Sequence, residues 1–284
     1  MGKLFTNIIN SRLNTWAELN NIFCKSQFGF REGLGTVDCM FALHGVIELL
    51  LSKSKTVFCA FIDLKKAFDR TNRRALWFKL HKNKVSSKIV VLLKNMYSKI
   101  KVRVKQTANK RHDSGSDKDD CFFASKTGVF QGESLSPFLF SMFLNDINDA
   151  LKNDNDVGIN LFEWILTILL FADDMALVSE SRIGLQKGLD NLAKYCDKWG
   201  LEVNIDKTKC VAFKNGGKIG TLDKWTYKSH PLETVSHFKY LGFVFGSSGK
   251  FAKGIQNLAE QGNRALFSLK KIIHSSDKRS MYGF

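Results

Sequence analysis

Two adjacent carboxylates, Asp173 and Asp174, lie within an otherwise apolar stretch that runs from Ile165 to Val178. The β-prone residues on either side of the pair predict a buried β-hairpin with the two acids at its bend. Like charges that water cannot screen raise each other's pKa, and one pKa unit corresponds to about 1.4 kcal/mol. Two interpretations are open: Asp is a common turn residue, or the pair binds a metal ion. An acidic position elsewhere in the chain would favour the metal site.

Asp63 is such a position. It follows the β-prone run from Thr56 to Ile62, and a carboxylate that ends a buried strand lies at a sheet edge, where site residues of α/β folds are common. Asp63 could equally be the N-cap of a helix. Asp69 precedes a basic segment, and we expect it to cap the next helix or to pair with that segment.

Asp63, Asp173 and Asp174 together offer three carboxylates on what could be adjacent strands of one sheet. Hard divalent cations take oxygen ligands, and Mg²⁺ typically uses one or two carboxylates together with substrate phosphates and water. Two such ions about 4 Å apart can bind the attacking and leaving oxygens of an in-line phosphoryl transfer. The chemistry that these residue types favour is therefore metal-assisted phosphoryl transfer.

The spacing of apolar residues predicts the elements that must position these acids. We expect helices over residues 3–19, 37–51, 74–81, 87–98, 138–147, 185–200 and 255–273, and further strands over 201–205, 210–213 and 238–245. Ser136 and Pro137 are expected to be the N-cap and first position of the helix that follows them. Lys99 to Lys105 alternates basic and apolar residues, which predicts a strand whose cationic face is either solvated or in contact with a sugar-phosphate backbone.

The composition is that of a folded, basic protein. Its 284 residues are 44% hydrophobic and include 24 Phe, enough for one large domain or two small ones. Lys and Arg number 43 against 27 Asp and Glu, and the net charge of +16 favours nucleic acid as a partner over an anionic membrane or an acidic protein. No apolar run could span a bilayer and no signal peptide is recognisable, so we expect an intracellular protein of the nucleus or the cytoplasm. The six Cys lack C-x-x-C spacing, which argues against a zinc ribbon or a disulfide framework.

Five short motifs occur in a fixed order along the chain. They are Phe61-x-Asp63-x-x-x-Ala67-Phe68-Asp69, Gly128-x-x-Gln131-Gly132-x-x-x-Ser136-Pro137, Phe171-Ala172-Asp173-Asp174, Asn204-x-x-Lys207-Thr208 and Tyr240-Leu241-Gly242. In order and spacing they resemble the reverse transcriptases of LINE-type, non-LTR retrotransposons. Gln27-x-Gly29-Phe30-Arg31 resembles the block that precedes them in that family, although the glycines beside Arg31 are also typical of a helix-entry loop or a phosphate contact. The resemblance covers about residues 3–273.

The resemblance implies an α+β fold with the architecture of a polymerase right hand. Residues 1–55 would form part of the fingers, residues 56–245 a palm with an RRM-like antiparallel sheet and inserted fingers elements, and residues 246–284 the start of a thumb. The basic segment that precedes residue 3 in the family and the rest of the thumb would then lie outside the chain, which we expect to be incomplete at both ends.

The resemblance also implies a role for each motif. Asp63, Asp173 and Asp174 would bind two Mg²⁺ ions, for which Mn²⁺ could substitute. Phe68 would lie under the sugar of the incoming nucleotide and exclude a 2′-hydroxyl, although an aromatic residue of the core is the other interpretation. The remaining residues would be Gln131 and Gly132 at the nucleotide and template, Lys207 near the triphosphate as a proton donor or as a solvated turn residue, and Tyr240, Leu241 and Gly242 at the primer end.

The sequence therefore predicts an RNA-directed DNA polymerase domain that adds dNTPs to the 3′-hydroxyl of a DNA primer on an RNA template. Phe130 stands where the family usually has Pro or Arg, and Glu133 where a small or uncharged residue is common. These departures bear on the loop geometry and on nucleotide affinity. The alternative is a non-catalytic, nucleic-acid-binding remnant of such a polymerase, and a basic α/β protein unrelated to polymerases would leave the order of the motifs unexplained.

Overall fold

The computed structural model describes residues 2–98, 101–103, 122–124, 127–130, 132–152 and 156–280. The helices in these ranges are α1 Gly2–Leu19, α2 Thr36–Ser52, α3 Ala67–Arg70, α4 Arg73–Lys82, α5 Ser87–Ser98, α6 Ser136–Leu144, α7 Ile147–Leu151, α8 Arg182–Trp199 and α9 Ala252–Ser280. The strands are β1 Val57–Ile62, β2 Lys101–Arg103, β3 Phe122–Ala124, β4 Ile159–Leu161, β5 Trp164–Leu166, β6 Ile168–Phe171, β7 Asp174–Ser179, β8 Lys209–Phe213, β9 Trp225–Tyr227, β10 His230–Thr234, β11 His237–Tyr240 and β12 Phe243–Gly246.

Strand β1 is central to the main sheet, whose order over the described residues is β6-β7-β1-β8-β10-β9. It pairs antiparallel with β7 and β8, and β10 joins β8 in parallel. All the residues of β1 are buried, because both faces of the sheet are covered. Phe58 and Ile62 belong to a core shared with α4, α6 and α8, whereas Cys59 and Phe61 belong to a second core shared with α2, β11 and β12. The predicted strand and the α+β class are confirmed.

The predicted hairpin around Asp173 is also confirmed, as β6 and β7. Its strands are antiparallel, with Phe171 opposite Asp174. The expectation that the acids are buried is wrong for Asp174, which is exposed, while Asp173 is half-buried. The reason is that the pair stands at the end of the strands, beyond the helices that cover the sheet.

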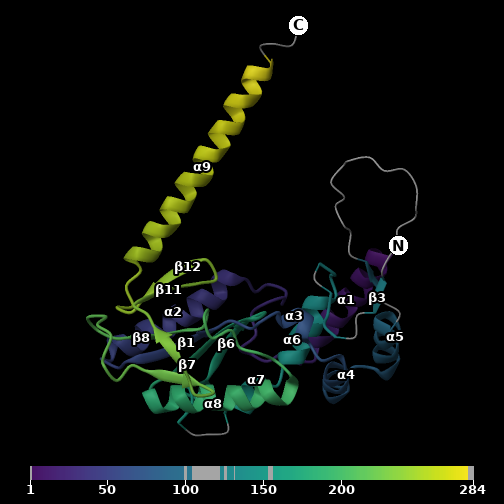
Figure 1. Ribbon diagram of the computed structural model, residues 1–284, viewed down its shortest axis with the longest axis horizontal. Coiled ribbons are helices and arrows are strands. Elements are labelled where there is room, and N and C mark those ends of the chain that lie inside the picture. The colour runs from purple at the N-terminus through teal and green to yellow at the C-terminus, as the bar shows by residue number, and fades with distance from the viewer. Residues whose placement is uncertain are drawn as a thin grey trace, which may run out of the picture.

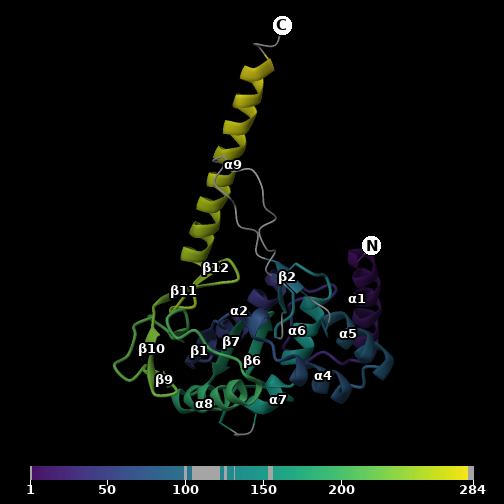
Figure 2. The ribbon, with the colours of Figure 1, turned by 45° about the vertical axis from the view of Figure 1, so that its right-hand side comes forward.

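The helices predicted from apolar periodicity are present, although the segment expected as one helix over 138–147 divides into α6 and α7. Helix α8 begins at an N-cap, Ser181, whose hydroxyl accepts from the Gly184 N–H at 2.9 Å, and it ends at Gly200 with φ +73°. It lies with α7 below the sheet, and α9 extends away from β12 (Figures 1 and 2). None of the described helices combines the length and the apolar character that crossing a bilayer requires.

Two of the predicted strands are wrong. Residues 201–205 form a single β-bridge, Val203 with Leu64, because this segment turns through residues 205–207 to hold the end of β1. Residues 238–245 are not one strand but parts of the hairpin β11–β12. Leu241 and Gly242 have φ of +48° and +93°, which extended backbone does not adopt. Leu241 and Gly242 form the turn that reverses the chain between β11 and β12.

Two predicted helix caps are also wrong. Ser136 is buried inside α6, which Leu135 precedes as the capping residue. Asp69 lies within the short helix α3. Asn72 is the cap of α4, since its Oδ1 accepts from the N–H groups of Arg74 at 3.0 Å and Ala75 at 3.2 Å. In both cases the capping residue lies one to three positions from the predicted one.

The predicted basic strand from Lys99 to Lys105 is present in part. Lys101 to Arg103 form β2, which pairs antiparallel with β3. Lys99 and Lys105 lie outside the described residues. The cationic face of this segment therefore stays a prediction.

Candidate active site

The three predicted carboxylates come from two neighbouring strands. Ile62 at the end of β1 is paired with Met175 of β7, so Asp63 follows β1 next to Asp174 at the start of β7. Asp173 occupies the bend, where Ala172 has φ +59°. We call Asp63, Asp173 and Asp174 the acid corner.

The segment after α8 holds Asp63 in place from both sides of its backbone. The Asn204 N–H donates to the Asp63 carbonyl oxygen at 2.8 Å, and the Asp63 N–H donates to the Thr208 Oγ1 at 3.3 Å. Lys207 Nζ lies 3.9 Å from Asp63 Oδ2. The motif Asn204-x-x-Lys207-Thr208 therefore positions the first carboxylate and supplies its nearest cation among the described residues.

The electrostatics of the acid corner are unfavourable for three ionised groups. Burial raises the pKa of Asp173, and the charge of Asp63 raises it further against the effect of a backbone hydrogen bond. Burial also raises the pKa of Asp174, with smaller increases from the charges of Asp173 and Asp63. A cation bound between these groups would relieve the repulsion.

The donor set fits a hard divalent ion that a ligand helps to coordinate. The described part of the chain contains no group of three or more His, Cys, Asp or Glu side chains that could hold a metal ion alone. Mg²⁺ does not require such a group, because it retains water and is commonly bound by one or two carboxylates together with substrate phosphates. The open cavities on either side of the acid corner leave room for those further ligands.

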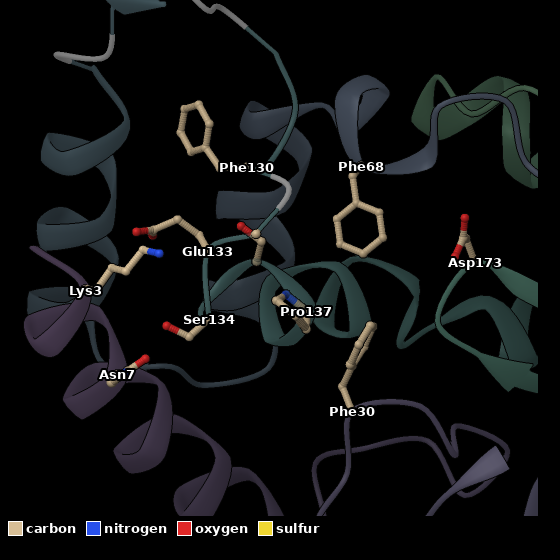
Figure 3. Close-up of a pocket in the computed structure, with 11 residues that line it drawn as sticks. Lys3, Asn7, Phe30, Phe68, Phe130, Glu133, Ser134, Pro137 and Asp173 are labelled. Atoms are coloured by element: carbon tan, nitrogen blue, oxygen red, sulfur yellow. The ribbon is translucent and has the colours of Figure 1, made fainter. Parts of the chain in front are cut away.

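A cavity of about 630 Å³ lies on one side of the acid corner (Figure 3). Its lining residues are Lys3, Asn7, Phe30, Phe68, Phe130, Gly132, Glu133, Ser134, Ser136, Pro137 and Asp173. Figure 3 shows Asp173, Phe68 and Phe30 at one end, and Lys3, Asn7 and Glu133 at the other. The cavity thus joins one carboxylate to aromatic faces and to a polar end.

Phe68 is placed at this cavity by a strained turn. Lys66 has φ +49° immediately before α3, and the Phe68 ring stacks on Phe140 of α6 with centroids 4.7 Å apart. Phe68 is half-buried, so one side of the ring contacts the core and the other borders the cavity. The contact with Phe140 fits the interpretation as a core aromatic, and the role of Phe68 at a nucleotide stays a prediction.

The glycine-rich loop forms another wall of the cavity. Gly128 has φ +80°, and a Cβ there would come within 2.6 Å of the Asp69 carbonyl oxygen, so the loop fits tightly against α3. The Phe130 ring stacks on Tyr97 at 5.3 Å, and the Arg73 guanidinium lies 5.0 Å from the Tyr97 centroid. Gly132 lines the cavity with φ +83°, whereas Gln131 lies outside the described residues.

A second cavity, of about 450 Å³, lies on the other side of the acid corner. Its lining residues are Phe61, Ile62, Asp63, Asp174, Met175, Asp206, Lys207, Lys209, Phe238, Lys239, Tyr240 and Leu241. Tyr240 is buried, with its hydroxyl 3.6 Å from Cys39 Sγ, and Leu241 and Gly242 form the turn of β11–β12. The acid corner therefore stands between two cavities, one bounded by Phe68 and the other by the Tyr240 hairpin.

The segment Gln27 to Arg31 supports the hairpin of the acid corner. Gln27 bridges to Leu170, and a Cβ on Gly29 would lie 2.4 Å from the Ala172 nitrogen, so only glycine fits there. Arg31 pairs with Glu18 at 2.7 Å, so it holds α1 rather than facing the cavities. The segment leads towards α2, as the predicted entry loop would, and the phosphate contact stays a prediction.

Sequence reasoning missed part of the cavity lining. Phe30, with φ +62° and 42% exposed, and Lys3 and Asn7 of α1 all face the larger cavity. An aromatic residue between Gly29 and Arg31 was the available signal for Phe30. Lys3 and Asn7 carry no local signal, because their position follows from the packing of α1.

Solved structures identify the class of fold. Apo telomerase from Candida tropicalis is similar to this chain with a TM-score of 0.59 and 14% identity, over 86% of this chain and 39% of that one. A form of it truncated from the C-terminal domain gives a TM-score of 0.58 and 16% identity, over 85% of this chain and 43% of that one. The fold is therefore that of the polymerase right hand.

The sequence comparison identifies the family. The family described as "Reverse transcriptase (RNA-dependent DNA polymerase)" matches residues 1–245, and the chain belongs to it. The RNA-directed DNA polymerase from mobile element jockey of Drosophila funebris is 28% identical, over 99% of this chain and 30% of the relative. The type-1 retrotransposable element R2 Pol polyprotein of Nasonia vitripennis is 27% identical, over 73% of this chain and 20% of the relative. The predicted resemblance to non-LTR retrotransposon enzymes is confirmed, and the chain spans less than a third of the length of these relatives.

Proposed function

We propose that this chain is an RNA-directed DNA polymerase domain that extends a DNA primer on an RNA template with dNTPs. The observation that carries the proposal is the convergence of Asp63, Asp173 and Asp174 between two cavities in a member of the reverse transcriptase family. In this assignment the larger cavity takes the nucleotide and the smaller one takes the primer end. The division into fingers (1–55), palm (56–245) and thumb (246–284) is part of the proposal.

Asp63, Asp173 and Asp174 would hold two Mg²⁺ ions, or Mn²⁺ in their place, and the ions would supply charge stabilisation for the phosphoryl transfer. The contribution of the protein is mainly position and charge. Asp63 is fixed at the strand end by Asn204 and Thr208. Lys207, close to Asp63 and exposed, is in reach of a triphosphate and could donate a proton to the departing pyrophosphate.

The two cavities give the remaining residues their roles. Phe68 lies under the sugar of the dNTP, and its ring leaves no room for a 2′-hydroxyl, while Gln131 and Gly132 contact the nucleotide and the template. Tyr240, Leu241 and Gly242 support the primer end from the hairpin β11–β12. Because nucleic acid templates and dNTPs occur inside the cell, the proposal places the protein in the nucleus or the cytoplasm.

Primer extension on an RNA template tests the function. We expect extension with dNTPs and Mg²⁺, and its loss by about 100-fold or more in Asp173→Asn, because a neutral amide removes one of the few carboxylates at the site. Asp156→Asn is the matched control, since Asp156 precedes β4 and makes a surface pair with Lys187 of α8. Equal extension by both variants would contradict the proposal. No extension by the folded wild-type chain, with RNA binding retained, would identify a non-catalytic remnant.

Selection between ribo- and deoxyribonucleotides tests the role of Phe68. We expect Phe68→Val to lower the preference for dNTP over rNTP by about 10-fold or more, because the smaller side chain admits the 2′-hydroxyl. Phe162→Ala is the control, since Phe162 is 97% exposed at the β4–β5 turn. The ratio of kcat/KM for the two nucleotides is the measurement. An unchanged ratio would leave Phe68 as a core aromatic only.

A further inference from the structure

A second group of charged side chains lies where α4, α6 and α8 meet. Lys79 is 1% exposed, and its Nζ donates to the Phe143 carbonyl oxygen and to Asp146 Oδ1, each at 2.6 Å, and to the Tyr195 hydroxyl at 2.8 Å. The same Nζ lies 4.0 Å from the centroid of the Trp199 ring. We call Lys79, Asp146 and Tyr195 the buried lysine network. Through these contacts, Lys79 fixes the positions of the Asp146 carboxylate and the Trp199 ring.

A cavity of about 350 Å³ opens beside this network. It is lined by Asp146, Ala150, Asn191, Lys194, Tyr195, Lys198 and Trp199. Lys194 and Lys198 are exposed and one helical turn apart on α8, a spacing at which like charges repel. Lys194 Nζ donates to Asn191 Oδ1 at 3.4 Å, and Lys198 Nζ lies 5.1 Å from the Trp199 centroid. Neither lysine pairs with a carboxylate in the described ranges.

The acidic residues nearby form no ion pair with these two lysines in the described ranges. Asp197 pairs with Lys228, and Asp190 accepts from Gln186 Nε2 at 2.9 Å. Asp146 is engaged by the buried lysine network. Burial lowers the pKa of Lys79 to about 8, and Lys82 and Lys198 contribute to this decrease against the opposing effect of Asp146. Lys194 and Lys198 therefore border the cavity without an ion-pair partner among the described residues, and an anion bound between them would reduce their mutual repulsion.

We propose that this cavity is a second nucleic-acid site, which binds the phosphodiester backbone of single-stranded RNA through Lys194 and Lys198. A cavity of about 350 Å³ is too small to enclose a duplex, so only part of a flexible single strand could enter it. Phe78 is 59% exposed, and its ring lies 6.5 Å from that of Trp199, so it offers a face on which a neighbouring base can stack. Sites for single-stranded nucleic acid typically combine positive charges that contact the backbone with aromatic rings on which bases stack.

The site lies on the opposite face of the sheet from Asp63. Helix α8 packs on the face to which Ile62 belongs, whereas Asp63 follows the alternation of Cys59 and Phe61 on the other face. Figure 1 shows α7 and α8 below the sheet and the hairpin β11–β12 above it. RNA bound at Lys194 and Lys198 therefore does not compete with ligands at the acid corner.

Binding of a labelled single-stranded RNA of about 20 nucleotides, measured by fluorescence anisotropy at several salt concentrations, tests the proposal. We expect the double variant Lys194→Gln/Lys198→Gln to bind about 10-fold more weakly and to lose about 1.4 from the slope of log K against log salt, since each single-strand phosphate contact contributes about 0.7. The control is Lys218→Gln/Lys224→Gln, which removes the same charge from two exposed lysines elsewhere. It should change the affinity by less than about twofold. Phe78→Ala should weaken binding about 5-fold or more with an unchanged salt slope.

Three outcomes would overturn the proposal. Equal weakening by the two double variants would mean that only total charge matters. Unchanged RNA binding by Lys194→Gln/Lys198→Gln, with the melting temperature of the wild type, would show that the two lysines do not bind RNA. Loss of binding to phosphatidylserine vesicles in that variant, with RNA binding intact, would assign the lysines to a membrane surface instead. Because the probe contains no primer, these results do not depend on whether the chain polymerises DNA.

Discussion

The acid corner and the buried lysine network handle charge in opposite ways. At the acid corner three carboxylates gather with one lysine, Lys207, at 3.9 Å from Asp63, and burial and mutual repulsion raise the pKa values of Asp173 and Asp174. In the buried lysine network a single cation has three hydrogen-bond acceptors. A satisfied buried charge holds elements together, whereas an unsatisfied cluster at a cavity is costly unless a ligand completes it. The contrast separates a region whose buried charge is satisfied within the fold from one whose charges are not.

Removal of the buried cation should have the largest effect on stability. We expect Lys79→Met to lower the free energy of unfolding by about 3 kcal/mol, because Asp146 loses its cation and keeps only the neutral hydroxyl of Tyr195 as a side-chain donor among the described residues. Urea denaturation measures the change. Lys82→Met, at an exposed lysine of the same helix, should change the free energy by less than about 0.5 kcal/mol. If Lys79→Met changes the free energy of unfolding only slightly, water replaces Lys79 as the partner of Asp146. The buried lysine network would then not stabilise the fold in the way that this comparison states.

Asp223 extends the comparison to a satisfied buried acid. Its carboxylate is 0% exposed and accepts from Lys214 Nζ at 2.7 Å, Arg182 Nε at 2.9 Å and the Gly220 N–H at 2.6 Å. Burial would raise its pKa, but these hydrogen bonds outweigh burial and lower the pKa below 3.8. We expect Asp223→Asn to cost about 2 kcal/mol at neutral pH, measured by urea denaturation.

The sign of the pH dependence at Asp223 follows from its lowered pKa. The stabilisation is fully present above the unfolded pKa of about 3.8 and is lost as the pH falls through the lower value of the folded protein. The difference between the wild type and Asp223→Asn should therefore shrink below about pH 4. If the difference in the free energy of unfolding stays constant down to about pH 2, Asp223 stabilises the fold through packing and not through its charge.

Neutralising Asp174 in the acid corner should stabilise the fold, the opposite of the effect at Asp223, and the change in the free energy of unfolding should be the smallest of the three. Because the pKa of Asp174 is raised, its ionisation destabilises the folded state as the pH rises above 3.8. We expect Asp174→Asn to raise the free energy of unfolding at neutral pH by less than about 1 kcal/mol, since the group is exposed and solvent screens it. Mg²⁺ should stabilise the wild type more than the variant, because binding to the folded state adds RT ln(1 + [Mg²⁺]/Kd). Thermal unfolding with and without Mg²⁺ measures both effects.

A loss of stability in Asp174→Asn would show that the carboxylate is already satisfied in the ligand-free protein. The matched control is again Asp156→Asn, whose exposed pair with Lys187 should contribute little. Mg²⁺ should act equally on this control and on the wild type.

The sequence predicted the positions of the three acids because their signals are local. A β-prone run that ends in Asp63 and two apolar runs around Asp173 and Asp174 require only alternation and turn chemistry. The same local reasoning was wrong at residues 238–245, because the positive φ of Leu241 is not encoded by apolar content. It also did not single out Lys79, which lies in a helical pattern where lysine usually faces solvent.

The sequence by itself determined the longer helices, the central strand β1, the hairpin with Asp173 and Asp174 at its bend, and the family. Apolar periodicity and the order of short motifs can be recognised without any knowledge of tertiary contacts. Only the tertiary structure decided that Asn204 and Thr208 hold Asp63, that Phe30 and Lys3 line the same cavity as Asp173, and that Lys79 is buried. These features join residues far apart in the chain. Their free energies depend on burial and on hydrogen-bond partners, which exist only once the helices have packed on both faces of the sheet.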